Sequence, residues 1–190
     1  MFLAHHGSRG ASRGARRMST CTMPTPIGTL ELVEQGGAIV RITARGPGAI
    51  SAPPTNAILA AASEQLARYF EGRLETFAVP VDPEGTPFQR RLWAALREIP
   101  YGETRTYGQL ATQISSVARA VGQACGANPV PIVIPCHRVL AAHGRIGGFS
   151  FPRGTNSKRR LLALEARHTG LFAALPPASP NELSVAARPR

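Results

Sequence analysis

A connector rich in proline divides this chain of 190 residues and constrains its fold more than any other feature. The connector spans residues 80–87 and contains three prolines and one glycine. Such segments end regular secondary structure and are typical of domain boundaries. The chain is long enough for two small domains that each contribute to a core, and too short for a large multidomain assembly.

The charge balance changes sign at the same connector. Residues 19–87 carry four arginines and seven acidic residues, a net charge of −3, whereas residues 88–165 carry eleven basic and three acidic residues, a net charge of +8. The asymmetry indicates that the second segment meets a polyanion, with nucleic acid the first candidate. All but one of its basic residues are arginine, which suits phosphate binding but is equally explained by codon bias.

The first segment has the pattern of a small α+β unit. Residues 27–33 and 38–43 alternate around Gln35-Gly36-Gly37, which predicts a β-hairpin with a glycine turn. Apolar residues at helical spacing predict a helix over residues 57–70 that stops at Gly72. Residues 77–81 are expected to form one more strand.

The second segment is predicted to be mainly helical. Helices are expected over residues 88–99, 106–114 and 117–125, with Ser115 or Ser116 capping the third. Two short helices joined by a tight turn in a basic segment suit a helix-turn-helix, although an ordinary helical hairpin has the same pattern.

The third of these helices is unusual because its side chains are small. Ala118, Ala120 and Gly122 lie near Arg119, the only large polar residue in its first half. A helix without bulky side chains could enter the narrow minor groove of DNA. Close packing against a neighbouring helix explains the same composition.

The strongest chemical signal is Cys136-His137-Arg138, which follows an apolar run, 129–135, that we expect to be a strand framed by prolines. A free thiol has a pKa near 8.5, so a nucleophilic cysteine needs a nearby base or a positive field. His137 and Arg138 could supply both. A buried cysteine that acts only as a small hydrophobe is the alternative, and it is our interpretation of Cys125.

Around Cys136 the sequence resembles the O6-alkylguanine-DNA alkyltransferase family. The resemblance covers roughly residues 23–166 and is strongest after Gly85. Its motifs, in chain order, are Arg68-Tyr-Phe-Glu-Gly72, Gly85-Thr-Pro-Phe-Gln89, Ile99-Pro-Tyr-Gly-Glu-Thr104, Thr106-Tyr-Gly-Gln-Leu-Ala111, Arg119-Ala-Val-Gly122, Asn128-Pro-Val-Pro-Ile-Val-Ile-Pro-Cys-His-Arg-Val139 and Lys158 to Glu165.

The resemblance implies an α+β architecture in which a small ribonuclease H-like α/β domain precedes a winged-helix (helix-turn-helix) domain. A composition rich in Gly, Ser and Arg predicts a disordered basic extension over residues 1–20, and the resemblance then implies a scaffold domain over 21–86. A DNA-binding and alkyl-acceptor domain follows over 87–166, and a flexible tail over 167–190.

The resemblance also implies the roles of individual residues. Cys136 accepts the alkyl group, His137 relays its proton through a water, and Glu165 orients the imidazole. Tyr107 contacts the phosphate beside the flipped nucleotide and donates to the base, and Asn128 is the hinge between recognition helix and active site. The remaining expected residues contact DNA (Arg119, Ala118, Ala120, Gly122 and Arg138, together with Tyr107) or line the base pocket (Val139, Phe149 and Ser150).

The implied activity is direct-reversal repair in which O6-alkylguanine, and by extension O4-alkylthymine, loses its alkyl group irreversibly to the protein. Arg119 would fill the gap left by the flipped base. The expected partner is double-stranded DNA bound through the minor groove by a monomer, without cofactor or metal, since Cys21, His5 and His6 are too sparse for a zinc site. With every apolar stretch interrupted, the protein is expected in the cytoplasm, near the nucleoid.

Three other function classes compete with repair. A noncatalytic alkyltransferase-like protein would bind damaged DNA without accepting the alkyl group, and the presence of Cys136 argues against it. A winged-helix regulator controlled by methylation and a hydrolytic Cys/His enzyme are the other two. No activator domain and no oxyanion hole are evident in the sequence.

Overall fold

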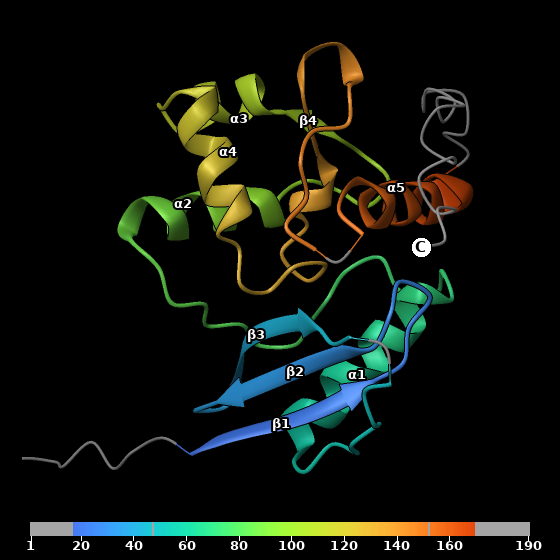
Figure 1. The fold of residues 1–190 in the computed structure, drawn as a ribbon. Coiled ribbons are helices and arrows are strands. Elements are labelled where there is room, and N and C mark those ends of the chain that lie inside the picture. The colour runs from blue at the N-terminus through green and yellow to red at the C-terminus, as the bar shows by residue number, and fades with distance from the viewer. Residues whose placement is uncertain (1–16, 47, 152, 170–190) are drawn as a thin grey trace, which may run out of the picture.

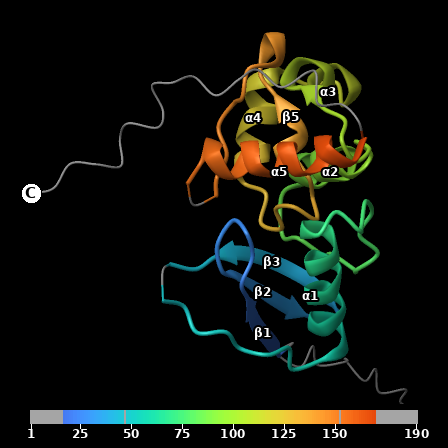
Figure 2. The same cartoon turned by 90° about the vertical axis from the view of Figure 1, so that its right-hand side faces the viewer.

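The computed structural model describes residues 17–169 except Pro47 and Pro152, and it places them in two domains, one below the other in Figure 1. The first domain contains an antiparallel sheet of strands β1 (Met18–Met23), β2 (Leu30–Gln35) and β3 (Ala38–Ala44), in that order. Helix α1 (Ala57–Phe70) covers one face of the sheet (Figures 1 and 2). Leu32, Leu59 and Leu66 are fully buried in this layer.

The hairpin and its glycine turn are as predicted, but two features of the first domain differ from prediction. Gly36 and Gly37 have φ of 64° and 87°, the left-handed conformations that a tight hairpin turn requires. The prediction of a strand over residues 77–81 was wrong: Val81 makes one isolated bridge to Ile39, and Pro80 has no N–H to continue a ladder. Strand β1 was not predicted, and it includes residues 18–20, which we had assigned to the extension. Residues 1–16 lie outside the described part of the chain.

The second domain contains α2 (Pro87–Arg97), α3 (Tyr107–Gln113), α4 (Ala118–Gly126) and α5 (Thr155–Thr169). Short elements join them: β4 (Arg105–Thr106) pairs in parallel with β5 (Val139–Leu140), and 3-10 turns η1 and η2 span Cys136–Arg138 and Ala142–Gly144. The three predicted helices are present with slightly shifted ends. Helix α5 continues to Thr169, past the boundary expected at residue 166, and residues 170–190 are outside the described part.

Two local predictions for the second domain were wrong. Neither Ser115 nor Ser116 caps α4, because its N-cap is Val117, which forms no side-chain cap. The apolar run 129–135 is a buried loop instead of a strand, with one isolated bridge between Pro131 and Ile134. Prolines that lack N–H groups and a positive φ of 77° at Ile132 prevent a regular ladder there.

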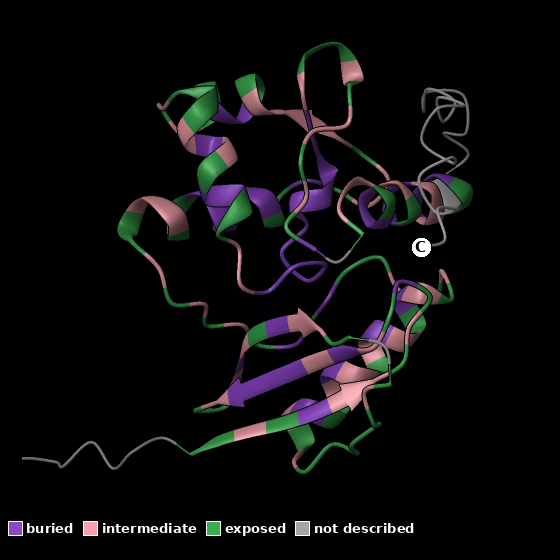
Figure 3. Ribbon diagram, viewed as in Figure 1, coloured by how far each residue is buried: buried purple, intermediate pink, exposed green. Residues whose placement is uncertain are grey.

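This buried loop also forms a non-covalent contact between the two domains. The backbone N–H of Ile42 in β3 donates to the carbonyl of Pro129 at 2.8 Å. One hydrophobic cluster runs through both domains, and the loop is buried throughout residues 130–135 (Figure 3). No helix in the described ranges is long and apolar enough to span a bilayer.

Candidate functional site

A pocket of about 340 Å³ lies beside the C-terminal half of α4 and has Cys136 in its wall. Its volume falls within the usual range for small-molecule sites. The pocket brings together the first residue of α3, the last turn of α4, η1 and the loop before α5. The lining residues are Tyr107, Gly122, Cys125, Gly126, Cys136, Gly148, Phe149 and Ser150.

Asn128 holds the Cys136 thiol in place. Its amide nitrogen Nδ2 lies 3.2 Å from Cys136 Sγ and also donates to the Ile134 carbonyl at 2.9 Å. Its Oδ1 accepts from the Val130 N–H at 3.0 Å, which fixes the amide orientation. Burial raises the pKa of Cys136, and the Asn128 hydrogen bond and the Lys158 charge act against that shift. The resting thiol is therefore protonated, with groups nearby that stabilise its thiolate.

His137 has one ring nitrogen engaged and the other free to accept a proton. Its Nε2 lies 2.7 Å from Glu165 Oε1, and both residues are almost completely buried. Burial lowers the pKa of His137, which keeps the imidazole neutral. Because an ionised carboxylate only accepts, Nε2 must carry the hydrogen and Nδ1 the lone pair. His137 Nδ1 is buried and has no hydrogen-bond partner in the described structure, so it is available as a base.

Glu165 is the centre of a buried network. It accepts from Arg138 Nε at 2.9 Å, from Arg138 Nη2 at 3.0 Å, from the Tyr69 hydroxyl at 2.7 Å and from the Gly102 N–H at 3.1 Å. Burial alone would favour the neutral acid, but His137 and Arg138 outweigh it and hold the pKa of Glu165 well below its usual range. Glu165 is therefore ionised and oriented by several donors at once.

Two of the predicted residues do not lie where they were expected. Arg138 was expected to contact DNA, but its guanidinium is buried, paired with Glu165 and bonded to the Ile99 carbonyl. Val139 was expected to line the pocket, but its side chain is fully buried elsewhere and its carbonyl accepts from Lys158. Phe149 and Ser150 do line the pocket, as the resemblance implied.

Lys158 and Tyr69 also belong to the site, and neither was predicted from the sequence to have a role there. Lys158 is fully buried, and its Nζ lies 5.9 Å from the centre of the Tyr107 ring. Burial lowers its pKa, and the nearby Cys136 and Cys125 thiols act against that shift. A signal was available, because Lys158 is the only lysine in a chain of 22 Lys and Arg residues. Tyr69 also lay inside a matched motif, Arg68 to Gly72, but nothing local indicated its partner.

Tyr107 reaches the pocket because glycines give it room. A Cβ added at Gly147 would lie 3.0 Å from the Tyr107 hydroxyl and ring, and one at Gly122 would lie 3.9 Å from the ring. Burial raises the pKa of Tyr107 to about 12, so its hydroxyl stays a neutral hydrogen-bond donor. The ring therefore forms a fixed wall next to Cys136.

The outer face of α4 is exposed and carries the predicted DNA contacts. Ala118 and Arg119 are exposed, whereas Ala120 and Gly122 are half-buried. No acidic residue lies in the first turn of the helix. Gly122, one turn after Ala118, also lines the pocket, so the face and the pocket meet within this short helix, with Cys125 and Gly126 continuing the pocket wall.

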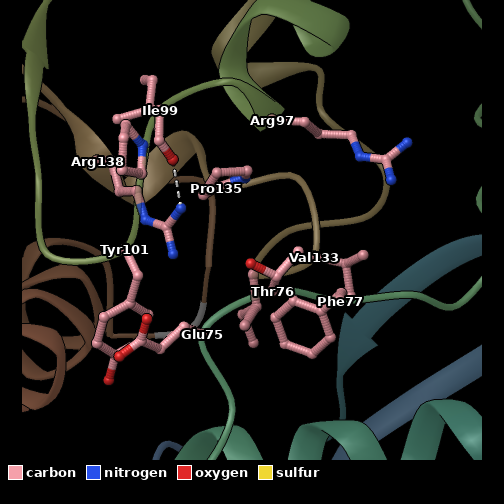
Figure 4. A pocket seen from close by; sticks show the side chains of 11 residues that line it. Glu75, Thr76, Phe77, Arg97, Ile99, Tyr101, Val133, Pro135 and Arg138 are labelled. Atoms are coloured by element: carbon pink, nitrogen blue, oxygen red, sulfur yellow. Dashed lines mark hydrogen bonds between the residues drawn. The ribbon is translucent and has the colours of Figure 1, made fainter.

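A second, smaller cavity of about 120 Å³ lies at the domain junction, with Glu75, Phe77, Tyr101 and Arg138 among its lining residues (Figure 4). Arg138 enters it beside the Ile99 carbonyl, and Cys136 is not part of its wall. We therefore place the chemistry in the larger pocket. Across the described ranges, no three His, Cys, Asp or Glu residues are grouped in a way that could hold a metal ion.

Comparison with known proteins gives matches over both domains. Residues 18–83 match the family model of the 6-O-methylguanine DNA methyltransferase ribonuclease-like domain, and residues 87–167 match that of the DNA binding domain of the same family. The methylated-DNA–protein-cysteine methyltransferase of Mycobacterium bovis is 43% identical over 150 residues, 76% of this chain and 90% of that protein. The one from Mycolicibacterium paratuberculosis is 53% identical over 112 residues, 58% of this chain and 67% of that protein. The crystal structure of Mycobacterium tuberculosis OGT in complex with DNA aligns with a TM-score of 0.70 and 41% identity, covering 78% of this chain and 93% of that one.

Proposed function

This chain belongs to the 6-O-methylguanine DNA methyltransferase family, and from that premise we propose that it repairs alkylated DNA by moving the alkyl group onto its own Cys136. The substrate is O6-alkylguanine in duplex DNA, with O4-alkylthymine as a further one. Each molecule reacts once, because the thioether formed is not readily cleaved by water or by cellular thiols.

The observation that carries the proposal is the position of Cys136 Sγ. The thiol lies in the wall of a pocket of about 340 Å³, within hydrogen-bond distance of Asn128 and next in sequence to a histidine whose free nitrogen is buried. A nucleophile, a base and an orienting carboxylate are therefore in one place, which is the arrangement that nucleophilic catalysis requires.

The reaction balances with the groups that are present. The Cys136 proton passes through a water to His137 Nδ1, and the imidazolium that forms is stabilised by Glu165 at 2.7 Å from Nε2. Sγ then attacks the alkyl carbon in line, so an S–C bond forms while the C–O6 bond breaks and its electron pair stays on guanine. Guanine is protonated on a ring nitrogen, with the Tyr107 hydroxyl as donor and the proton from Cys136 as net source.

Lys158 supports the thiolate electrostatically. Its ammonium group acts electrostatically on both Cys136 and Cys125 and is held by the Val139 carbonyl. A cation close to a thiol lowers the free energy of its ionised form. In this scheme Lys158 offsets part of the burial that raises the pKa of Cys136.

On the DNA side, α4 enters the minor groove and Arg119 occupies the space of the flipped nucleotide. Three features support this: the exposed Arg119, the small exposed or half-buried residues around it, and the net charge of +8 over residues 88–165. An arginine can stack in the vacated space and offset part of the lost base stacking, which costs a few kcal/mol. The proposed complex contains one protein molecule for each lesion.

The test is to mix the protein with duplex DNA that carries O6-methylguanine, digest the product and map the added mass. We expect one added CH₂ on the peptide that contains Cys136, at no more than one per protein molecule, and none in Cys136→Ser. Tight binding with an unmodified Cys136 would favour the noncatalytic damage binder instead. Repeated turnover would contradict the single use of each molecule.

A further inference from the structure

A cavity of about 300 Å³, here called the α5 groove, lies between α5 and the first domain. Its apolar wall combines the loop between β1 and β2, the last residue of α1 and one side of α5: Pro26, Ile27, Phe70, Leu161, Ala163 and Leu164. In Figure 2, α5 lies directly above this loop. The α5 groove is separate from the pocket of Cys136, because no residue lines both.

Two exposed arginines lie along the α5 groove. Arg160 and Arg167 are seven residues apart on α5, so they project from the same side of the helix about 10 Å apart along its axis. Arg160 Nη1 donates to the Pro26 carbonyl at 2.9 Å and so joins the two domains. The groove therefore combines an apolar floor with guanidinium groups, which donate to carbonyl or carboxylate oxygens.

The floor of the groove is not fully covered by the described residues. Phe70 and Leu164 pack against the hydrophobic cluster, yet both remain half-buried. Further burial of such side chains is favourable, since it removes apolar surface from water. A concave apolar surface with a few polar groups at its edge is typical of a binding site.

The chain itself supplies an apolar segment next to the groove. Helix α5 ends at Thr169, and Gly170 follows it directly. Glycine is the usual residue where a chain turns away from the end of a helix. The next five residues, Leu171-Phe-Ala-Ala-Leu175, are all apolar, and Pro176-Pro177 follow them. Five extended residues span about 16 Å, which is enough to cover a groove about 10 Å long.

Charge also favours this segment over the other parts of the chain outside the described range. Residues 170–175 carry no charge, whereas residues 1–16 carry three arginines and no acidic residue. Residues 176–190 carry two arginines and one glutamate. Because Arg160 and Arg167 repel further cations, an uncharged apolar segment suits the groove best.

We propose that residues 170–175, here called the strap, turn back along α5 and fill the α5 groove of the same molecule. Leu171 and Phe172 then cover Phe70 and Leu164, and carbonyl groups of the strap accept from Arg167. Because the groove is formed by both domains, the strap holds the first domain against α5, the helix that carries Glu165. The inference does not depend on the proposed alkyl transfer.

Photo-crosslinking in the full chain tests the position of the strap. Phe172 is replaced by the photoreactive p-benzoylphenylalanine, and the irradiated protein is digested and mapped by mass spectrometry. We expect crosslinks within one molecule to the loop that contains Pro26 and Ile27, which is remote in the sequence. The same label at Leu183 is the control and should give no preferred crosslink. A product of twice the monomer mass would place the segment on a second copy, and crosslinks spread over the surface would show that the groove is not its site; either result would overturn the inference.

A double-mutant cycle tests whether the strap stabilises the fold. Leu171→Ser combined with Phe172→Ser should lower the Tm by about 3–6 °C, because the apolar contacts are lost. Ala163→Gln places a longer polar side chain in the groove and should lower the Tm by a similar amount. In the presence of Ala163→Gln, the two strap substitutions should cost nothing further, since the strap is already displaced. Leu183→Ser, beyond the strap, is the matched control and should shift the Tm by about 1 °C or less.

Two results of the cycle would overturn the inference. An unchanged Tm in the strap variant would mean that the segment makes no stabilising contact. Fully additive losses would mean that the strap and Ala163 do not meet. Neither readout involves DNA, so a protein that shows the crosslink but never modifies Cys136 would support the strap while contradicting the proposed function.

Discussion

Each domain buries one glutamate, and the two differ in what surrounds them. Glu34, in β2 of the first domain, accepts from the Gly37 N–H at 2.7 Å and from Asn56 Nδ2 at 2.9 Å. Both of these donors are neutral. Glu165, in α5 of the second domain, accepts from Arg138 at two nitrogens and faces His137. The same residue type at similar burial is therefore built into two different electrostatic environments.

The difference shows what each domain does with a buried charge. Glu34 joins the hairpin turn to the residue that caps α1, so its role is to connect local structure. Glu165 joins four separate parts of the chain and sets the tautomer of the imidazole next to Cys136. Buried charge networks of this kind contribute little net stability and are retained where they serve chemistry or specificity.

The largest expected effect comes from neutralising each glutamate in turn. Glu165→Gln leaves the Arg138 guanidinium buried without a counter-ion, which should lower the free energy of unfolding by about 3–5 kcal/mol. It also removes the charge that stabilises the His137 imidazolium, so alkyl transfer should slow by about 10² or more. Glu34→Gln should cost about 1 kcal/mol and leave the rate unchanged. Urea unfolding measures the free energy of unfolding, and a quenched time course of alkyl transfer from free O6-benzylguanine measures the rate.

If Glu165→Gln does not fold, Glu165→Asp provides the same comparison with the charge retained. It should fold and should still slow alkyl transfer, because the carboxylate lies one methylene further from His137. Equal rates for the Glu34 and Glu165 variants would remove the functional distinction between the two sites.

A smaller effect is expected at the tyrosine that links the domains. Tyr69, in α1, donates to Glu165 at 2.7 Å, so Tyr69→Phe should lower the free energy of unfolding by about 1.5–3 kcal/mol and slow transfer less than Glu165→Gln. Tyr101 is the matched control, since its ring lies 6.0 Å from that of Tyr69 and its buried hydroxyl has no partner in the described structure. Tyr101→Phe should be neutral or slightly stabilising. A similar loss in both variants would show that ring packing, and not the bond to Glu165, matters.

The smallest expected effect is a dependence of stability on pH that belongs to the second domain. The pKa values of His137 and Glu165 are both lowered in the folded state, so the unfolded chain binds more protons than the folded one at acid pH. The contribution of these two groups to the free energy of unfolding should therefore be fully present above pH 6.5. It should decrease below pH 6.5, where His137 is protonated in the unfolded chain, and decrease further below pH 4.5, where Glu165 is protonated in the unfolded chain. Urea unfolding at pH 7.5, 5.5 and 4 tests the sign, and Glu165→Asn should flatten the decline below pH 4.5. Stability that increases on acidification would contradict the assignment.

Much of the fold was predictable because its signals are local. The glycine turn at Gly36-Gly37, the helix that ends before Gly72 and the three helices after the connector all follow from periodicity, caps and breakers. The cysteine and its neighbours were found because several motifs occur together in order. Prediction failed at the loop 129–135, where burial on all sides overrides local preference, and at the N-cap of α4, which is Val117 and not one of the two serines before it.

The sequence by itself determined the division into two domains, the location of the positive charge and the choice of Cys136 as candidate nucleophile, because each depends on composition or on residues that are adjacent in the chain. Only the tertiary structure decided which groups surround Cys136 and His137. Tyr69 and Glu165 are 96 residues apart, and Arg138 could be read as a surface residue until its guanidinium was seen to face Glu165. A pKa depends on burial and on the charges within a few ångströms, and those distances are set by the packing of elements that are remote in the chain.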